Sequence, residues 1–336
     1  MALYHGLPRL GLPRGSTVLV PSYHQGIEID TLLAAGHRVR YYRVTEQLST
    51  DVADLERCLD GSVSALYITH YLGFAQPLAP IQQFCEAHHL KLIEDCALSL
   101  WSRARDTWLG SVGDLALFSV YKTLPIPHGG YLVTRGRSAP APLRPAPATS
   151  TIVQMADLVH EGLRASGWRQ LDQWATRASR GFTKAARWDR TRTICSGADW
   201  DPRLLEYGAS PWIARLMRLM DPAAVVTRRR ANYTRLASQL RTLVACPFPD
   251  LPAGTCPLFF PIMVSNKIQF QRDLAELGVR SGNWWDHAHP TCPAAVAEQV
   301  AGWRRHCLEL PIHQELGAEE IDRVAAAVLS VLARQD

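Results

Sequence analysis

Apolar and polar positions follow a repeating order over the first 137 residues of the chain. Short runs dominated by apolar residues predict strands, and they lie at 17–20, 39–44, 65–69, 90–95, 115–119 and 131–134. Between them, segments of helical spacing predict helices at 27–35, 51–59 and 80–88. Strands that alternate with helices pair into a largely parallel sheet with helices on both faces, so the pattern predicts an α/β fold.

A proline-rich stretch at 138–149 predicts a connector. It divides the chain into a large domain at 1–137, a connector with an Arg/Trp-rich segment at 138–200, and a smaller α+β domain at 201–336. The predicted elements of the last domain are a helix at 211–240 that is interrupted near Asp221 and Pro222, a strand at 258–264, and helices at 269–277 and 318–333.

Arginines and tryptophans are interleaved in a helical pattern at 151–189. A helix that binds a membrane surface or a polyanion has this composition. An ordinary solvated helix with buried tryptophans has it too, and this second interpretation is the one we favour.

Composition narrows the class of protein. A net charge of +5 over 336 residues is mild and does not support nucleic-acid binding. No apolar run approaches the roughly 20 residues that span a bilayer, and residues 1–5 lack the pattern of a signal peptide. The eight cysteines include no Cys-x-x-Cys pair, which argues against zinc and disulfides and predicts a reducing cytoplasm.

Polar residues follow three of the predicted strands where each strand ends. His70, Asp95 and Ser119 lie at such ends, and ligands of parallel sheets bind at the carboxyl ends of the strands. Lys122 follows Ser119 closely and is one of only four lysines, against 32 arginines. Only an amine of this kind can lose its proton and form a Schiff base, although a lone lysine can equally be a surface cation.

Six segments, taken in order, carry a resemblance to a known family. They are Val20-Pro21-Ser22-Tyr23, Thr69-His70-Tyr71-Leu72-Gly73, Ile93-Glu94-Asp95-Cys96-Ala97, Gly110-Ser111-Val112-Gly113-Asp114 with Phe118-Ser119, Lys122-Thr123-Leu124 with Gly129-Gly130, and Leu310-Pro311-Ile312-His313-Gln314-Glu315-Leu316. Together they resemble the DegT/DnrJ/StrS family of pyridoxal-phosphate (PLP) aminotransferases, which have the fold-type I architecture.

The resemblance implies roles for five cofactor-site residues. Lys122 would form the aldimine with the PLP aldehyde and would then move a proton between two carbons of the reacting system. Asp95 would pair with the protonated pyridine nitrogen and keep the ring an electron sink. Ser119 would bind the phosphate. His24 and Gln25 occupy the region where the family places a ring stacked on the pyridine.

Two histidines are candidates for the substrate side of the site. The resemblance implies that His70 lies near the substrate or orients its neighbouring loops. His287 belongs to a stretch, 286–289, that resembles the C-terminal segment approaching the substrate. Its histidine pair could also suggest a metal site, but a convincing third ligand is missing, so no metal is predicted.

Four departures from the family pattern concern the cofactor. The chain is expected to begin just after a Gly-Thr or Gly-Ser pair whose amides hold the phosphate at a helix N-terminus. Leu98 replaces a glutamine that bonds the phenolic oxygen of the cofactor. Ser119 and Lys122 are two residues closer together than usual, and His128 replaces an acidic residue before Gly129 and Gly130.

The leading hypothesis is therefore a PLP-dependent aminotransferase that acts on a keto group, most plausibly that of a nucleotide-linked keto sugar, with a separate amino donor. Another PLP reaction such as dehydration is the first alternative. A non-catalytic protein of the same fold, used for scaffolding or regulation, is the second. Since fold-type I enzymes build their sites at a dimer interface, the resemblance also implies a homodimer.

Overall fold

The structure, a computed structural model, describes residues 1–136, 143–146 and 205–334. The helix predicted at 151–189 lies outside the described residues, and so does the predicted domain limit near residue 200.

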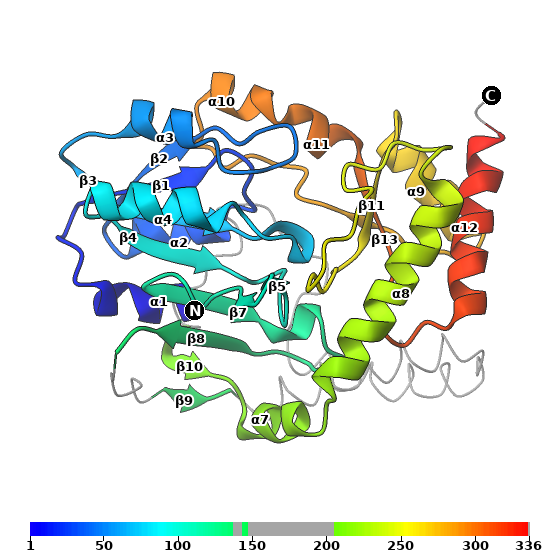
Figure 1. The fold of residues 1–336 in the computed structure, drawn as a ribbon, viewed down its shortest axis with the longest axis horizontal. Coiled ribbons are helices and arrows are strands. Elements are labelled where there is room, and N and C mark those ends of the chain that lie inside the picture. The colour runs from blue at the N-terminus through cyan, green and yellow to red at the C-terminus, as the bar shows by residue number, and fades with distance from the viewer. Residues whose placement is uncertain (137–142, 147–204, 335–336) are drawn as a thin grey trace, which may run out of the picture.

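A six-stranded sheet forms the larger lobe (Figure 1). Its order is β2-β1-β3-β4-β7-β8, and every neighbouring pair is parallel except β7 and β8. The strands span β1 Thr17–Pro21, β2 Arg38–Tyr42, β3 Val63–Thr69, β4 Lys91–Asp95, β7 Leu115–Ser119 and β8 Gly130–Thr134. The mostly parallel sheet expected from the sequence is confirmed, and the antiparallel strand lies at its edge.

Helices cover both faces of this sheet. On one face lie α1 Ala2–Gly6, the 3-10 turn η1 Leu7–Leu10, and α2 Ile27–Ala34; on the other lie α3 Val52–Cys58 and α4 Leu78–Ala87. Successive strand residues supply the two cores, as Val18 and Val20 face the first set of helices and Leu19 faces the second. Burial on both faces explains why the strands read as continuous apolar runs.

Shorter elements complete the larger lobe. They are the 3-10 turns η2 Tyr71–Gly73 and η3 Val120–Lys122, the hairpin β5 Arg103–Ala104 with β6 Thr107–Trp108, the pair β9 Arg144–Pro145 with β10 Tyr207–Gly208, and α7 Pro211–Arg218. Helix α7 packs its Ile213 against Leu100 and Val120 of the larger lobe, although its residues follow the predicted domain limit at 201. That limit stays a prediction.

The smaller lobe is built on a three-stranded antiparallel sheet. Its order is β11 Phe260–Met263, β13 Cys307–Leu310 and β12 Gly282–Asn283. Helices α8 Pro222–Leu240, α9 Lys267–Glu276 and α12 Ala318–Leu332 share a core with it, while α10 Ala294–Gln299 and α11 Ala301–His306 lead into β13. The interruption predicted near residue 221 is confirmed, because Asp221 caps the N-terminus of α8 by accepting from the amides of Ala223 and Ala224.

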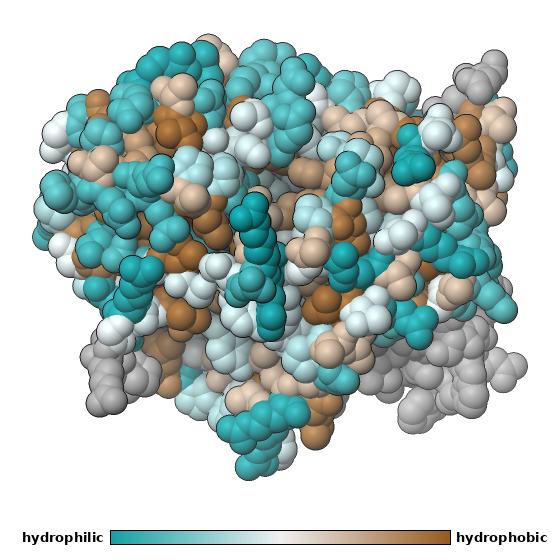
Figure 2. Space-filling model, viewed as in Figure 1, coloured by the Kyte–Doolittle hydropathy of each residue, from teal (hydrophilic) through white to brown (hydrophobic). Residues whose placement is uncertain are grey.

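The surface is mainly polar on the face shown in Figure 2, where apolar side chains lie in small groups among hydrophilic ones. Among the described residues, none of the helices combines the length and apolar character that crossing a membrane requires.

Candidate active site

The carboxyl ends of the strands meet at one edge of the large sheet. The parallel register aligns Thr69, Asp95 and Leu117, so the loops that follow β3, β4 and β7 start side by side. This edge faces the β11-β13-β12 sheet of the smaller lobe, and a cavity of about 560 Å³ lies between the two lobes. Residues from both lobes line it, so neither lobe makes the cavity alone.

The cavity is lined by some of the predicted site residues and not by others. Gln25, Leu98, Lys122 and His287 line it. Asp95, Ser119, His24 and His70 do not line it directly. The roles of these residues stay predictions, and their bonding shows which of them have free groups.

Lys122 differs from the other described lysines in its surroundings. It ends the 3-10 turn η3, and within the described residues its ammonium group has no hydrogen bond or ion pair. Lys91 pairs with Asp114 at the surface, and the buried Lys267 donates to the carbonyl of Arg304 at 2.7 Å. Among the described lysines, Lys122 is therefore the one that lines a cavity and whose amine has no hydrogen-bond or ion-pair partner.

Asp95 presents a buried carboxylate on the strand next to the one that leads to Lys122. Only 8% of the residue is exposed. One oxygen accepts from the hydroxyl of Tyr67 at 2.7 Å, and the other accepts from the amide of Ala97 at 2.8 Å. These bonds fix the carboxylate and leave lone pairs on both oxygens for a further donor.

Burial raises the pKa of Glu28, and the nearby Asp95 raises it further. Glu28 accepts from the amides of Gln25 and Gly26, which holds the loop before α2 in place. The two carboxyl groups are thus near enough for their negative charges to repel each other, and a cationic group close to them would be favoured.

His24 is a neutral imidazole that fastens the loop after β1. Its Nδ1 donates to the carbonyl of Pro21 at 3.1 Å, and its Nε2 accepts from the amide of His289 at 2.9 Å. Burial, and next the positive Arg304, lower the pKa of His24 to about 3. Both nitrogens are engaged and the ring is fully buried, whereas Gln25 reaches the cavity wall.

His70 is also fully buried, and its bonds lie within the protein. Its Nδ1 accepts from the amide of Gln76, so its Nε2 donates to Glu94 at 2.9 Å. Burial alone would raise the pKa of Glu94, but bonds from His70 and from the amides of Gly113 and Gly110 bring it below its usual value. This geometry gives no support to a substrate contact by His70 and agrees with a role in orienting loops.

His70, Glu94 and Cys96 approach one another closely enough to hold a metal ion. The two nitrogens of His70 are already bonded, and burial raises the pKa of the Cys96 thiol far above its ordinary value. A neutral thiol is a poor ligand, and Glu94 already serves backbone amides and His70. The cluster is better explained as structural bonding at the strand ends.

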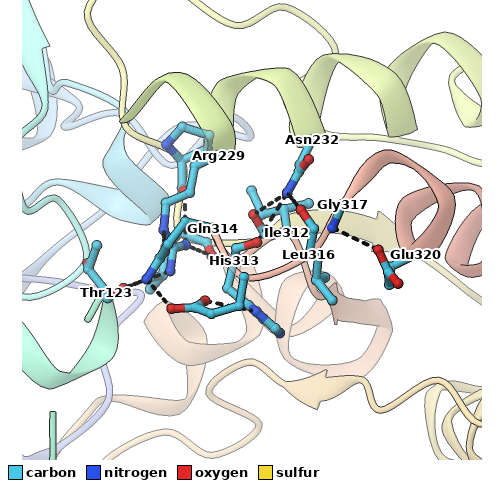
Figure 3. A network of polar contacts seen from close by, with 12 residues as sticks. Thr123, Arg229, Asn232, Ile312, His313, Gln314, Leu316, Gly317 and Glu320 are labelled. Carbon is cyan, nitrogen blue, oxygen red and sulfur yellow. Dashed lines mark hydrogen bonds and ion pairs between the residues drawn. The ribbon is translucent and has the colours of Figure 1, made fainter. Parts of the chain in front are cut away.

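A buried arginine ties the smaller lobe to the backbone beside Lys122 (Figure 3). Arg229 of α8 donates to the carbonyl of Thr123 at 2.9 Å, to the carbonyls of Pro257 and Leu258, and to Oε1 of Gln314 at 2.7 Å. Gln314 donates to the same Thr123 carbonyl at 3.1 Å. Two donors from the smaller lobe thereby fix the peptide that follows Lys122.

A second buried arginine makes a similar link on the other side of the cavity. Arg304 of α11 donates to the carbonyls of Ser22 and His24 in the larger lobe, and to those of Trp285 and His287 after β12. Its guanidinium lies 4.9 Å from the ring centre of Tyr23. The segment that carries His287 is therefore fastened to the loop that carries Gln25.

Sequence reasoning missed both arginines and one acidic residue. Arg229 stands in a run of three arginines, 228–230, and only the packing of α8 shows which of them points inward. Glu309 lies between Leu308 and Leu310 in β13 and lines the cavity. An acid within an alternating apolar strand was a usable signal, because its side chain must face away from the core of the leucines.

Comparison with known proteins identifies the family to which this combination of fold and site belongs. The architecture defines an α/β transferase with a lysine and a carboxylate at adjacent strand ends. Residues 1–329 match the model of the DegT/DnrJ/EryC1/StrS aminotransferase family. The chain belongs to this family, which confirms the resemblance seen in the sequence. The predicted class, a PLP-dependent aminotransferase of fold-type I, is the class of the family.

Curated relatives agree at low identity. GDP-perosamine synthase of Vibrio cholerae is 28% identical over 137 residues, which are 40% of this chain and 37% of that protein. The matched part therefore spans well under half of that relative. A UDP-N-acetyl-3-dehydro-alpha-D-glucosamine 3-aminotransferase of Acidithiobacillus ferrooxidans is 22% identical over 98% of this chain and 82% of its own length.

Solved structures share the fold across the whole chain. DesV of S. venezuelae, solved with a ketimine intermediate, has a TM-score of 0.70 at 19% identity, covering 100% of this chain and 83% of that one. The sugar aminotransferase Spr1654 of Streptococcus pneumoniae, described as putative and solved in its PLP form, has a TM-score of 0.70 at 14% identity, covering 99% and 85%. These likenesses establish the fold.

The residues present fit PLP in three respects. The cofactor aldehyde needs an amine without a competing partner, and Lys122 supplies one at the cavity. The pyridine nitrogen needs a fixed carboxylate, and Asp95 has free lone pairs on oxygens already oriented by Tyr67 and Ala97. Ser119 has no side-chain hydrogen bond in the described part of the chain and is available to an oxyanion. Its distance of three residues from Lys122 is covered by the single turn η3.

Replacement of Arg229 by methionine tests the link beside Lys122. The substitution leaves several buried carbonyls without a donor, so we expect the free energy of unfolding to fall by about 3 kcal/mol or more. Urea denaturation followed by fluorescence measures this loss. Arg235→Met is the matched control, since Arg235 pairs with Asp322 at the surface, and its loss should be far smaller. Equal losses in the two variants would contradict the role given to Arg229.

The bonding of His24 predicts a dependence of stability on pH. Its folded pKa of about 3 lies below the ordinary 6.5, so the contribution of His24 is complete above pH 6.5 and declines as the pH falls toward 3. Between pH 7.5 and 5 the loss should be about 2 kcal/mol. In His24→Gln, whose amide can donate and accept without titrating, this part of the pH dependence should vanish. Urea midpoints at the two pH values measure it, with His88→Gln, at a half-buried histidine, as control.

Proposed function

We propose that this protein transfers an amino group to the keto group of a nucleotide-linked keto sugar, with PLP as its cofactor and a separate amino donor. The observation that supports it most directly is the unpartnered amine of Lys122 in the cavity between the lobes. Membership of the aminotransferase family supports the reaction type. The relatives named for GDP- and UDP-linked products or substrates support the sugar nucleotide.

The protein's own residues have separate tasks in this proposal. PLP, when bound, supplies the electron sink that stabilises negative charge next to the reacting nitrogen. Lys122 holds the cofactor and, when released, takes and returns a proton at its Nζ. Asp95 accepts from the ring nitrogen while the Tyr67 hydroxyl keeps it oriented. Ser119 donates to the phosphate.

The cavity has features suited to a sugar nucleotide. Arg280, His287 and His313 line it and can meet phosphate oxygens, while the half-buried Trp285 offers a ring for a sugar or a base. Leu98 gives an apolar surface where the family usually has a hydrogen-bonding glutamine. We infer that the substrate enters between the lobes and that its carbonyl carbon comes to rest near Lys122.

A homodimer in the cytoplasm completes the proposal. Fold-type I sites are commonly shared between two subunits, and sedimentation of the full chain with and without PLP would measure this state. A second copy would then supply part of the phosphate site.

Borohydride trapping tests the role of Lys122. With PLP added, we expect a visible absorption band that borohydride removes, and peptide mass spectrometry should find the reduced cofactor on Lys122. Lys122→Ala should lose the band, and Lys91→Ala, a surface control, should retain it. A label on the buried Lys267, or a wild-type protein that stays colourless with PLP, would refute the assignment.

A substrate panel tests the reaction. GDP-linked and UDP-linked keto sugars are each incubated with the holoenzyme and labelled glutamate or glutamine. We expect transfer of the label to one of these sugars, detected by mass spectrometry, and an at least roughly hundredfold slower transfer in Asp95→Asn. Release of free ammonia without amino transfer would indicate dehydration or deamination instead. A PLP-loaded protein inert toward every sugar would contradict the substrate class.

A further inference from the structure

Glu309 is an acidic residue in the cavity that the proposed chemistry leaves unused. It lies in the central strand of the small sheet, between two leucines whose side chains belong to the core of the smaller lobe. Because successive strand residues point to opposite faces, the Glu309 side chain faces away from that core and into the cavity wall. The strand thus carries a carboxyl group to the site while its leucines hold the lobe together.

The neighbouring strands leave room for this carboxyl group. The residue paired with Glu309 on β12 is Gly282, and the one on β11 is Pro261. A methyl group built on Gly282 would overlap Oε2 and the carboxyl carbon of Glu309. Glycine is therefore the residue at 282 that allows the carboxyl group to lie over β12.

The carboxyl group has few partners of its own. In the described part of the chain it makes no hydrogen bond and no ion pair, unlike Glu28 and Glu94, which serve backbone amides. Two amines act on it from a distance, Lys122 across the cavity and Lys267 at the start of α9. The other charged or titratable residues that line the cavity are Arg229, Arg280, Asp286, His287 and His313.

The surroundings of Glu309 bring the pKa of its carboxyl group close to neutral pH. Burial raises the pKa of Glu309 to about 7, although Lys122 and next Lys267 act to lower it. An ordinary glutamate is almost never protonated at neutral pH and so is a weak proton acceptor. A carboxyl group that is half protonated near pH 7 can accept a proton and return it, which is the condition for efficient acid–base work.

We propose that Glu309 is the proton-exchange partner of Lys122. A proton leaves the Nζ ammonium of Lys122, giving a neutral amine, and Glu309 becomes a carboxylic acid; the reverse transfer restores both charges. The two groups form no direct ion pair within the described residues, so a hydroxyl of the substrate or a water molecule bridges them. The inference rests on the proposed role of Lys122.

Alternative roles for Glu309 fit the observations less well. A structural carboxylate would be bonded to amides or to a cation, as Glu94 and Glu28 are. A surface acid would lie in solvent, whereas Glu309 is half-buried and lines the cavity. Lys267 is the other amine near Glu309, but its bond to the Arg304 carbonyl fixes it within the smaller lobe.

The coupling between the two groups can be measured in the protein without PLP. The side-chain carboxyl of Glu309 is followed by NMR of protein with ¹³C-labelled glutamate, assigned with Glu309→Gln. We expect a titration midpoint near pH 7 in the wild type. In Lys122→Met the midpoint should rise by at least about 0.3 pH unit, because a cation that favours the carboxylate is gone. A wild-type midpoint near the ordinary value, or one that Lys122→Met leaves unchanged, would overturn the proposal.

The reciprocal measurement uses the small number of lysines. Only four lysines are present, so ¹³C-methylated amines give a spectrum with few signals to assign. The Lys122 midpoint should fall in Glu309→Gln and stay near the wild-type value in Glu309→Asp, which keeps the charge. Asp286→Asn is the matched control, a carboxylate of the same cavity that is paired with His287. A shift as large in Asp286→Asn would overturn the specific pairing.

Activity supplies a separate readout once a substrate is known. Glu309→Gln should lower kcat by about 100-fold and remove the limb of the pH profile near 7, while KM changes little. A drop confined to KM would mean that Glu309 binds substrate rather than exchanging protons, and would overturn the proposal. Failure of every substrate refutes the proposed function alone, because the two titrations do not depend on turnover.

Discussion

The bond from the Arg229 guanidinium to the carbonyl of Thr123 is the contact on which the site depends most. It joins a helix of the smaller lobe to the peptide directly after Lys122, and it is buried. Arg229 bonds carbonyls and an amide oxygen in place of a carboxylate, so its charge is dispersed over several dipoles. Without this bond the turn that presents Lys122 would lose its connection to the wall that presents Glu309.

The two lobes are fastened in the same way on both sides of the cavity. Arg304 repeats the device, bonding backbone carbonyls of the loop after β1 and of the segment after β12. Every residue has a backbone carbonyl that can accept a hydrogen bond, whatever its side chain. Two arginines can therefore fix these loops without requiring particular side chains in them. Burying a guanidinium costs solvation, and multiple bonds offset that cost. The loops after β1, β4 and β7 and the small sheet of the smaller lobe all contribute residues to the cavity wall.

The departures from the family pattern converge on the same region. The shortened segment from Ser119 to Lys122 forms one 3-10 turn, and Leu98 contributes an apolar surface beside it. On the wall formed by the smaller lobe, Glu309 places a carboxyl group in the same cavity.

Local patterns in the sequence are sufficient to predict the sheet, the helices on its two faces, the break before α8 and the family. The features that predict them are local periodicity, capping by Asp221 and short motifs at strand ends. Each of these features involves residues that are close together in the sequence. The small number of lysines, which singles out Lys122, and the position of Asp95 at a strand end can also be recognised from the sequence. The internal bonds of His24 and His70, the inward orientation of Arg229 within its run, and the position of Glu309 in the same cavity as Lys122 emerge from the folded chain. Each of these depends on which side chains from distant segments come together, and on how far burial changes their protonation, which no local pattern records.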